Sequence, residues 1–406
     1  MRPLRATLCG LAAAVAGFLA VPAHAQQAAG GDAAVVPFTI DVPDAVLYDL
    51  QDRLRATRFP DEIREADWDY GADLTYLREL VEYWRDQFDW RTQEARLNRF
   101  DQFTTDIDGL DIHFIHERSP HEGALPLLVL NGWPSSIDEY YKVIDALTDP
   151  VAAGGSAADA FHVVIPAMPG YGFSDKPREA GFDTNRMADF WVPLMARLGY
   201  TRYGVHGSDW GSAVAGWVAR KDTERIAGLH LVGCEGVLRS AVPLGRPADL
   251  EADGFGYVEI QSTRTQTVGY GLNDSPAGLA AWIVEKYHGW SDHDGNVEQA
   301  YTKDELLTNI MIYWVTGSIT SASRLYYENR HAARRPTEPI TVPTGCAGFV
   351  ERYDQRTRTG PQARQAAEER YNIIRWTDMP RGGHFPALEA PGLWLDDVRA
   401  FFADLR

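Results

Sequence analysis

Two amphipathic stretches follow an extended opening segment that begins at Phe38. Three leucines at helical spacing predict a helix that runs through Thr57: Leu47, Leu50 and Leu54. Asp44 stands just before this stripe, and we expect it to be the N-cap. A second stretch, residues 74–90, also repeats its apolar positions on one helical face. Residues 36–100 are therefore expected to form a mostly helical N-terminal lid with no chemistry of its own.

Short apolar runs that alternate with helical stretches predict a mostly parallel sheet after residue 100. Two alternating segments flank the turn dipeptide Asp108-Gly109 and predict a β-hairpin at 103–107 and 110–116. Four continuous apolar runs then predict strands buried on both faces: 125–130, 162–165, 203–206 and 229–232. Helical patterns separate them, as at 186–198 and 212–220, so the order of elements indicates an α/β fold.

The region from about 236 to 335 is helical in pattern and rich in Trp and Tyr, with no strand signal. Sheet character returns at 340–342 and 371–376, before a final helical stretch at 393–405. We therefore expect a helical cap inserted into one α/β core. The insertion divides the expected core into residues 101–235 and 336–406.

The N-terminus has the pattern of a targeting segment. Two arginines precede an apolar run at residues 8–21, which ends in Ala23-His24-Ala25. This arrangement is typical of a secretory signal peptide at residues 1–25, cleaved before Gln26, with a flexible linker at 26–35. An uncleaved membrane anchor is the alternative, and the small residues around the site favour cleavage. We therefore expect a secreted or periplasmic protein.

Composition and charge narrow the class of protein further. Of 406 residues, 45% are apolar and 24% are charged, which suits a globular protein with a large core. The net charge of −18 argues against a nucleic-acid partner. No long apolar run occurs after the first thirty residues, so no membrane span is expected in the mature chain. The oligomeric state is left open.

Two of the three cysteines remain once a signal peptide is removed, which excludes a disulfide scaffold or a Cys-rich zinc site. Cys234 and Cys346 both follow runs that are expected to form neighbouring strands. We predict a disulfide between them in an oxidising compartment. Two inert buried thiols are an equally weighted alternative.

The strongest chemical signal is the stretch Val205–Ser212, which has the form of a nucleophile elbow between a buried strand and a helix. Its glycines permit a tight turn that forces the central residue, Asp209, outward at the edge of the sheet. Ser208 is off-centre, so a serine esterase would need a shifted frame. The alternative is an ordinary strand-to-helix turn in which Asp209 is only an N-cap.

Two further motifs support the elbow. His384 lies in Arg381-Gly382-Gly383-His384-Phe385, between the last expected strand and the last helix, where α/β hydrolases place their base. Asn131-Gly132-Trp133-Pro134 directly follows the strand at 125–130. The backbone N–H groups of Trp133 and Trp210 would together form an oxyanion hole. A plain Gly/Pro turn with a core Trp is the alternative for this second motif.

With these motifs in place, the sequence resembles epoxide hydrolases of the microsomal type over nearly all of residues 36–406. The most specific stretches are 271–282 and 306–309, which look family-like throughout. The resemblance implies an α/β-hydrolase core with a mostly parallel sheet, a helical cap insertion and an N-terminal helical lid. It also implies that Tyr257 and Tyr326 hang over the nucleophile, and Tyr327 is the adjacent alternative to Tyr326.

The chemistry implied by this resemblance is hydrolysis of a small apolar epoxide by water to a vicinal diol. The tyrosines donate to the epoxide oxygen, Asp209 opens the ring and forms an ester, and His384 then activates a water. No metal or organic cofactor is needed. His113 and His116 would face opposite sides of their strand, so we reject a metal pair there.

Two positions depart from the family pattern. Asn131 stands where the family motif begins with His, and we expect Asn131 still to hold the loop by a hydrogen bond. The carboxylate that orients His384 is out of register, because the expected position falls at Arg352. Three neighbouring acids are ranked as replacements by the displacement that each needs: Glu351 first, then Asp354, then Glu235.

Two other functions remain open at this point. A haloalkane or haloacid dehalogenase would share Asp209 and His384, but it would bind halide without the two cap tyrosines. A secreted binding protein that kept the fold and lost activity is supported by Asn131 and the displaced acid. The physiological epoxide and the stereochemistry of its opening are left open.

Overall fold

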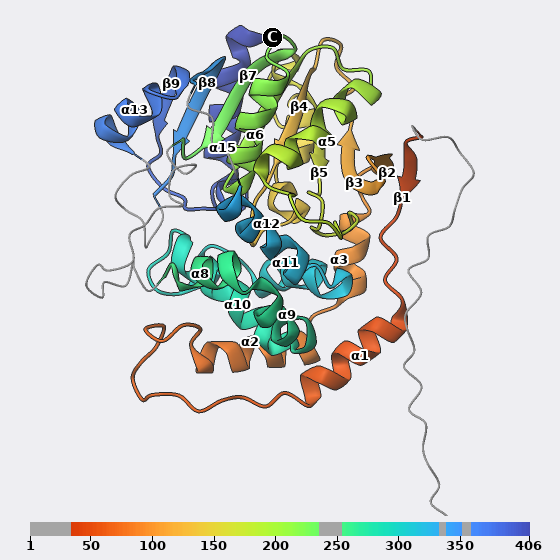
Figure 1. Cartoon of the computed structure of the whole chain (residues 1–406), viewed down its shortest axis with the longest axis vertical. Helices are drawn as coiled ribbons and strands as arrows, with labels where there is room; N and C mark the ends of the chain where they lie inside the picture. Colours follow the sequence, from red (N-terminus) through yellow and green to blue (C-terminus); the bar gives the residue numbers. More distant parts are fainter. Residues whose placement is uncertain (1–33, 235–253, 333–337, 351–358) are drawn as a thin grey trace, which may run out of the picture. The chain divides into compact units, whose positions relative to one another are not determined.

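The computed structural model describes residues 34–234, 254–332, 338–350 and 359–406 (Figure 1). All of these belong to one compact unit, residues 32–406. The three acids ranked above for the triad, Glu351, Asp354 and Glu235, lie outside the described residues, as do the expected signal peptide and most of the expected linker.

A nine-stranded sheet forms the centre of this unit, in the order β1-β2-β3-β5-β4-β6-β7-β8-β9. The strands are β1 (Val36–Phe38), β2 (Gln102–Ile107), β3 (Leu110–Glu117), β4 (Leu125–Leu130), β5 (Phe161–Pro166), β6 (Tyr203–Ser208), β7 (Ile226–Val232), β8 (Ile340–Gly348) and β9 (Tyr371–Asp378). The strands β1, β2 and β3 pair antiparallel, and β3 pairs antiparallel with β5. All the remaining pairs are parallel, as the apolar runs predicted.

Helices cover both faces of the sheet because its central strands are apolar on both sides. Every residue of β6 and β7 is buried, which is the pattern of parallel strands in an α/β protein. The helices of the core are α4 (Ile144–Thr148), α5 (Thr184–Arg197), α6 (Trp210–Lys221), α13 (Gly360–Glu368), α14 (Pro386–Glu389) and α15 (Pro391–Phe402). Figure 1 shows α5 and α6 in front of the sheet.

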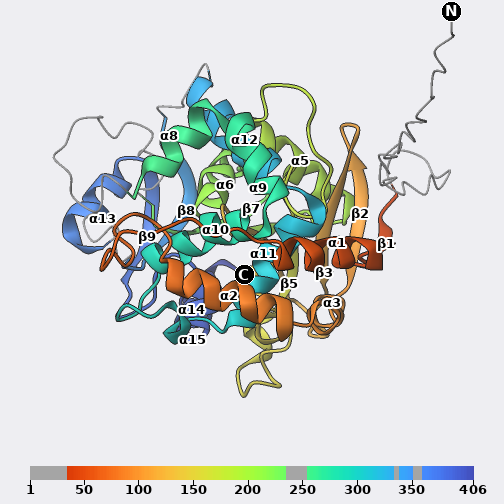
Figure 2. The ribbon, with the colours of Figure 1, turned by 90° about the horizontal axis from the view of Figure 1, so that it is seen from below.

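A layer of helices covers the edge of the sheet where the parallel strands end. The cap helices are α8 (Gly256–Thr263), α9 (Thr265–Asp274), α10 (Pro276–Trp290), α11 (Lys303–Thr316) and α12 (Ile319–His331). The N-terminal helices are α1 (Asp44–Arg55), α2 (Leu74–Asp86) and α3 (Trp90–Leu97). Helices α1 and α2 both contact α10, and Figure 2 views this layer from their side.

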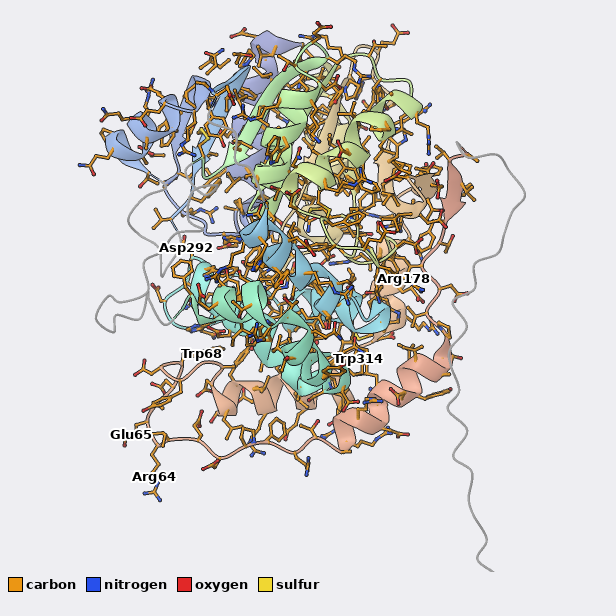
Figure 3. All side chains as sticks on the ribbon, in the orientation of Figure 1. Arg64, Glu65, Trp68, Arg178, Asp292 and Trp314 are labelled. Carbon is orange, nitrogen blue, oxygen red and sulfur yellow. A yellow bond between two sulfur atoms is a disulfide. The ribbon has the colours of Figure 1, made fainter. Side chains whose placement is uncertain are left out.

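Aromatic stacking joins the N-terminal segment to the cap. Trp68, which is labelled in Figure 3, stacks on the His288 ring of α10 with 3.8 Å between the ring centroids. Tyr83 of α2 donates a hydrogen bond to Asp304 of α11 at 2.9 Å. The N-terminal helices therefore hold the cap from the side opposite the sheet.

The structure corrects three details of the N-terminal prediction. Pro43 is the N-cap of α1, and Asp44 is its first helical residue, where its carboxylate pairs with Arg91. Helix α1 ends at Arg55, before the predicted end at Thr57. The predicted single helix at 74–90 ends at Asp86, because Asp89 accepts a hydrogen bond from the Arg91 N–H and starts α3 as a new helix.

The predicted disulfide between Cys234 and Cys346 is confirmed. The two Cα atoms lie 5.9 Å apart, within the range that a disulfide spans. Cys346 belongs to β8, and Cys234 follows its neighbour β7 by two residues. The bond therefore joins the ends of two adjacent parallel strands at the edge of the sheet that faces the cap.

One structural observation also bears on membrane association. Among the residues that the structure describes, no helix is long and apolar enough to cross a bilayer.

Candidate active site

The turn between β6 and α6 places Asp209 in a strained backbone conformation. Its φ of 49° and ψ of −127° lie in a region that non-glycine residues rarely adopt. The turn is packed closely against the end of β4, since a Cβ on Gly211 would lie 2.1 Å from the Leu130 carbonyl oxygen. This tight packing stabilises the strained turn and holds Asp209 at the edge of the sheet.

The Asp209 side chain is held by the loop after β4 and does not cap α6. Its Oδ1 accepts a hydrogen bond from the Trp133 backbone N–H at 2.8 Å. Asp209 occupies the N-cap position of α6, but its side chain makes no capping hydrogen bond there. A Cβ on Gly132 would lie 2.0 Å from Oδ1, so only glycine permits this approach. The alternative of a simple N-cap is therefore wrong.

His384 faces the other carboxylate oxygen of Asp209. Its Nε2 lies 3.4 Å from Oδ2, and the residue is almost fully buried. Its backbone N–H donates to the Trp290 carbonyl at 2.9 Å, and the two rings are 4.6 Å apart. The loop after β9 and the end of α10 together fix the position of this imidazole.

Glu389, which the sequence analysis missed, binds the backbone of the His384 loop. Its carboxylate accepts hydrogen bonds from the Gly383 and Phe385 N–H groups at 3.0 and 2.9 Å. Asp292, labelled in Figure 3, accepts a further bond from the Gly382 N–H at 2.8 Å. The peptide groups on both sides of His384 are thus tied to carboxylates, which limits the movement of the loop.

Tyr257 of α8 and Tyr326 of α12 meet above the tryptophans that flank Asp209. The Trp133 ring stacks on Tyr257 at 5.1 Å and meets Tyr326 edge-on at 5.8 Å. Trp210 meets Tyr326 edge-on at 4.8 Å, and the two tyrosine rings are 5.8 Å apart. The cap therefore places two phenol groups over the end of β6.

The environment of Tyr326 keeps its phenol neutral. Burial raises the pKa of Tyr326 well above its ordinary value, and the nearby Tyr257 and the negative charge of Asp209 add to this rise. The adjacent Tyr327 is 41% exposed and stacks on His331. Tyr327 thus lies on the outside of α12 and cannot take the place of Tyr326.

Asn131 holds the loop after β4, as its position predicted. Its amide nitrogen donates to the Gly132 carbonyl at 3.0 Å and contacts Ser135 Oγ at 3.3 Å. The cap also binds this loop: Asn309 donates a hydrogen bond to the Pro134 carbonyl, and Tyr313 donates one to the Ser135 carbonyl. The loop that presents the Trp133 N–H is therefore fixed from both sides.

A second carboxyl that the sequence analysis missed, Glu139, lies buried beside the elbow. It is 2% exposed, and the Ser208 hydroxyl donates to its Oε1 at 3.3 Å. Burial raises the pKa of Glu139 to about 7, although Ser135 and His384 oppose the rise. The sequence around position 139 mixes polar and aromatic residues, and a glutamate in such a stretch is usually exposed, so only the folded chain identifies this group.

We predict that Glu139→Gln removes a pH-dependent loss of stability. Because its pKa is raised in the folded state, Glu139 favours folding below about pH 4.5, and this contribution is lost as the pH rises through about 7. The free energy of unfolding of the variant, relative to wild type, should rise by about 3 kcal/mol from pH 4 to pH 8. Urea unfolding at both pH values measures this difference.

The matched control is the same substitution at the exposed Glu122, which should change stability equally at the two pH values. A difference between Glu139→Gln and wild type that is constant with pH would contradict the raised pKa of Glu139.

Comparisons with known proteins match this geometry. The model of the family described as "Epoxide hydrolase N terminus" matches residues 35–140, and that of "alpha/beta hydrolase fold" matches residues 126–253. A protein of Stigmatella aurantiaca, named as a proposed epoxide hydrolase, is 43% identical over 92% of this chain and 86% of its own. Epoxide hydrolase 1 of Sus scrofa is 37% identical over 93% of this chain and 90% of its own.

Solved structures give the same result. The juvenile hormone epoxide hydrolase of the silkworm Bombyx mori superimposes with a TM-score of 0.81 at 30% identity, covering 92% of this chain and 95% of its own. The epoxide hydrolase of Aspergillus niger superimposes with a TM-score of 0.76 at 30% identity, covering 92% and 97%. The chain therefore belongs to the epoxide hydrolases of the α/β-hydrolase fold.

Proposed function

We propose that the chain hydrolyses its epoxide in two steps, through an ester on Asp209. The arrangement of Asp209 carries this proposal, because one carboxylate oxygen faces the Trp133 N–H and the other faces His384 Nε2. Direct attack of water on the epoxide would need neither the strained turn nor a backbone donor on the carboxylate.

In the first step, Oδ2 of Asp209 attacks one carbon of the epoxide and the carbon–oxygen bond breaks. The leaving oxygen is a poor leaving group, so it needs hydrogen-bond donors as negative charge develops on it. The phenols of Tyr257 and Tyr326 supply these donors, and one of them gives its proton to the oxygen as the ring opens. The product is a hydroxyalkyl ester in which Oδ1 is the carbonyl oxygen.

In the second step, His384 Nε2 takes a proton from a water, and the hydroxide attacks Cγ of Asp209. Negative charge then moves onto Oδ1, where the Trp133 N–H already donates at 2.8 Å. The Trp210 N–H, at the first position of α6, is the second donor of the proposed oxyanion hole. Collapse of this intermediate breaks the bond between Cγ and Oδ2, and the proton on His384 passes to the leaving alkoxide to release the diol. The carboxyl group that remains returns its proton to the phenolate left by the first step, which restores the carboxylate.

The walls of the site favour an apolar epoxide. Five aromatic side chains contact one another beside the segments that carry Asp209 and His384: Trp133, Trp210, Trp290, Tyr257 and Tyr326. Such walls bury carbon surface on the substrate and leave the phenol groups to orient the oxygen. A small aryl epoxide such as styrene oxide is therefore the probe of choice.

The other two functions are not favoured. A dehalogenase would have no use for two phenols above Asp209, and the relatives described above are named for epoxide hydrolysis. Loss of activity was supported by Asn131 and by the displaced acid of the triad. Asn131 makes the hydrogen bonds that hold the loop, and the candidate acids lie outside the described residues.

We predict that oxygen from Asp209 enters the diol. In a single turnover with excess enzyme in heavy-oxygen water, the first diol should carry unlabelled oxygen, because the ester bond to carbon comes from Oδ2. Mass spectrometry of the diol measures this. Labelled oxygen in the first diol would show that water attacks the epoxide directly.

We predict that Tyr257→Phe and Tyr326→Phe each slow ester formation by roughly a hundredfold, the scale for removal of one oxyanion donor. Hydrolysis of the ester should change little, because the epoxide oxygen already carries its proton at that stage. Stopped-flow fluorescence of the site tryptophans separates the two rates. Tyr327→Phe is the control and should behave as wild type, whereas a double variant that forms ester at the wild-type rate would rule out the tyrosine roles.

We propose that Glu351 orients His384, with Asp354 and Glu235 ranked after it. In the sequence, Glu351 and Asp354 follow β8, and Glu235 directly follows Cys234, which comes after β7. Both strands end at the edge of the sheet that faces the cap. Loss of such an acid costs roughly 10⁴-fold in serine proteases, where it also holds a histidine. Alanine substitution of the true acid should let the ester form and then stall. A wild-type rate of ester hydrolysis in Glu351→Ala, with a stall in either other variant, would reverse the ranking.

We also propose that the chain is exported and loses residues 1–25. The Cys234–Cys346 disulfide supports this, because such bonds persist in oxidising compartments. Intact-mass measurement of protein from a secreting bacterial host should find a mature chain that begins at Gln26. Full-length protein confined to the cytoplasm would contradict export.

A further inference from the structure

A buried lysine of the cap lies against the ring of Tyr257. Lys286 belongs to α10, and its side chain is 3% exposed. Its Nζ lies 4.3 Å from the centroid of the Tyr257 ring and 5.8 Å from that of Trp290. The cation therefore lies over the face of a phenol that is proposed to act on the substrate.

Lysine is rarely buried without a reason, because removing an ammonium from water is costly. Among the residues that the structure describes, Lys286 pairs with Glu285 at 2.8 Å, and the Glu285 side chain is itself partly exposed. Burial lowers the pKa of Lys286, and the charge of Glu285 and its hydrogen bond oppose the change. An apolar residue would fill the same space without this cost. The buried charge of Lys286 therefore points to a function.

The same ammonium also contacts the chain just before α8. Its Nζ lies 3.4 Å from the carbonyl oxygen of Gly254, three residues before Tyr257. Lys286 thus contacts both the ring of Tyr257 and the segment that leads into the helix of Tyr257.

We propose that Lys286 is a positioning residue that strengthens Tyr257 as the hydrogen-bond donor to the epoxide oxygen. When a phenol shares its proton with a developing alkoxide, negative charge moves into the ring. A cation over the ring face stabilises that charge, and it does so more strongly away from water. This inference rests on the proposed function, and it adds Lys286 to the residues that promote ring opening.

The two tyrosines then differ in strength. Among the described residues, the cation–ring contacts include Tyr257 but none involves the ring of Tyr326. The proposal therefore makes Tyr257 the stronger donor and predicts that Lys286 acts through Tyr257 alone.

Four variants test this in single-turnover kinetics with styrene oxide. Lys286→Met removes the charge and keeps the length of the side chain, and Lys286→Gln removes the charge but keeps a donor for the Gly254 carbonyl. Both should slow ester formation by roughly tenfold and leave ester hydrolysis unchanged, the size expected of a desolvated cation–π contact. Lys286→Arg keeps the charge and should recover most of the rate.

Lys303→Met is the matched control. Lys303 is also a cap lysine over tyrosine rings, 5.9 Å from Tyr76 and 6.0 Å from Tyr83, but both rings belong to the N-terminal helix α2. Its loss should not alter ester formation. A wild-type rate of ester formation in Lys286→Gln would overturn the role of the charge, and this comparison with Lys286→Arg stands even if Lys286→Met does not fold.

A double-mutant cycle separates this role from general support of the cap. In a Tyr326→Phe background, Lys286→Gln should slow ester formation by the same tenfold factor as in wild type. In a Tyr257→Phe background it should have no further effect. An equal slowing in both backgrounds would overturn the inference while leaving the proposed function intact, whereas a wild-type enzyme that forms no ester would overturn both.

Discussion

The structure depends on one strained residue, Asp209, at the turn between β6 and α6. Its left-handed backbone is stable only because the turn packs against the end of β4, where Gly211 touches the Leu130 carbonyl. The same close packing brings Gly132 against the carboxylate and so places the Trp133 N–H on Oδ1. One steric constraint thus sets the direction of the carboxylate and supplies its backbone donor.

The other groups of the site reach Asp209 from separate parts of the chain, and the cap ties them together. Helix α11 binds the loop after β4 through Asn309 and Tyr313. The His384 loop is bound by Trp290, at the end of α10, and by Asp292, two residues after it. The cap therefore does more than cover the site, because it positions the backbone donor, the base and the two phenols relative to one another.

Much of this arrangement could be predicted from the sequence, because it depends on local patterns. Both ends of β4 were predicted correctly. The glycines in the elbow and in the His384 loop indicated tight turns at these two places. The choice of Tyr257 and Tyr326 among 18 tyrosines came only from the family resemblance, and the structure brings these two rings together.

The features that could not be predicted depend on burial of charge by distant segments. Glu139, Lys286 and Glu389 have apolar neighbours in the sequence, but a charged side chain in such a stretch usually faces solvent. In the folded chain, Glu139 and Lys286 are nevertheless buried and Glu389 is half-buried, because segments distant in the sequence pack around them. For the same reason, an acid shifted by one residue from its family position cannot be assigned from spacing alone.

The disulfide has a consequence for how the cap is anchored. The chain leaves the sheet after Cys234 and returns at β8, and the bond closes this excursion across a sequence separation of 112 residues. The disulfide therefore closes the cap insertion covalently. The two ends of the insertion stay together whether or not the cap helices are folded. Even with the cap helices unfolded, the bond would keep the ends of β7 and β8 side by side at the edge of the sheet beneath the cap.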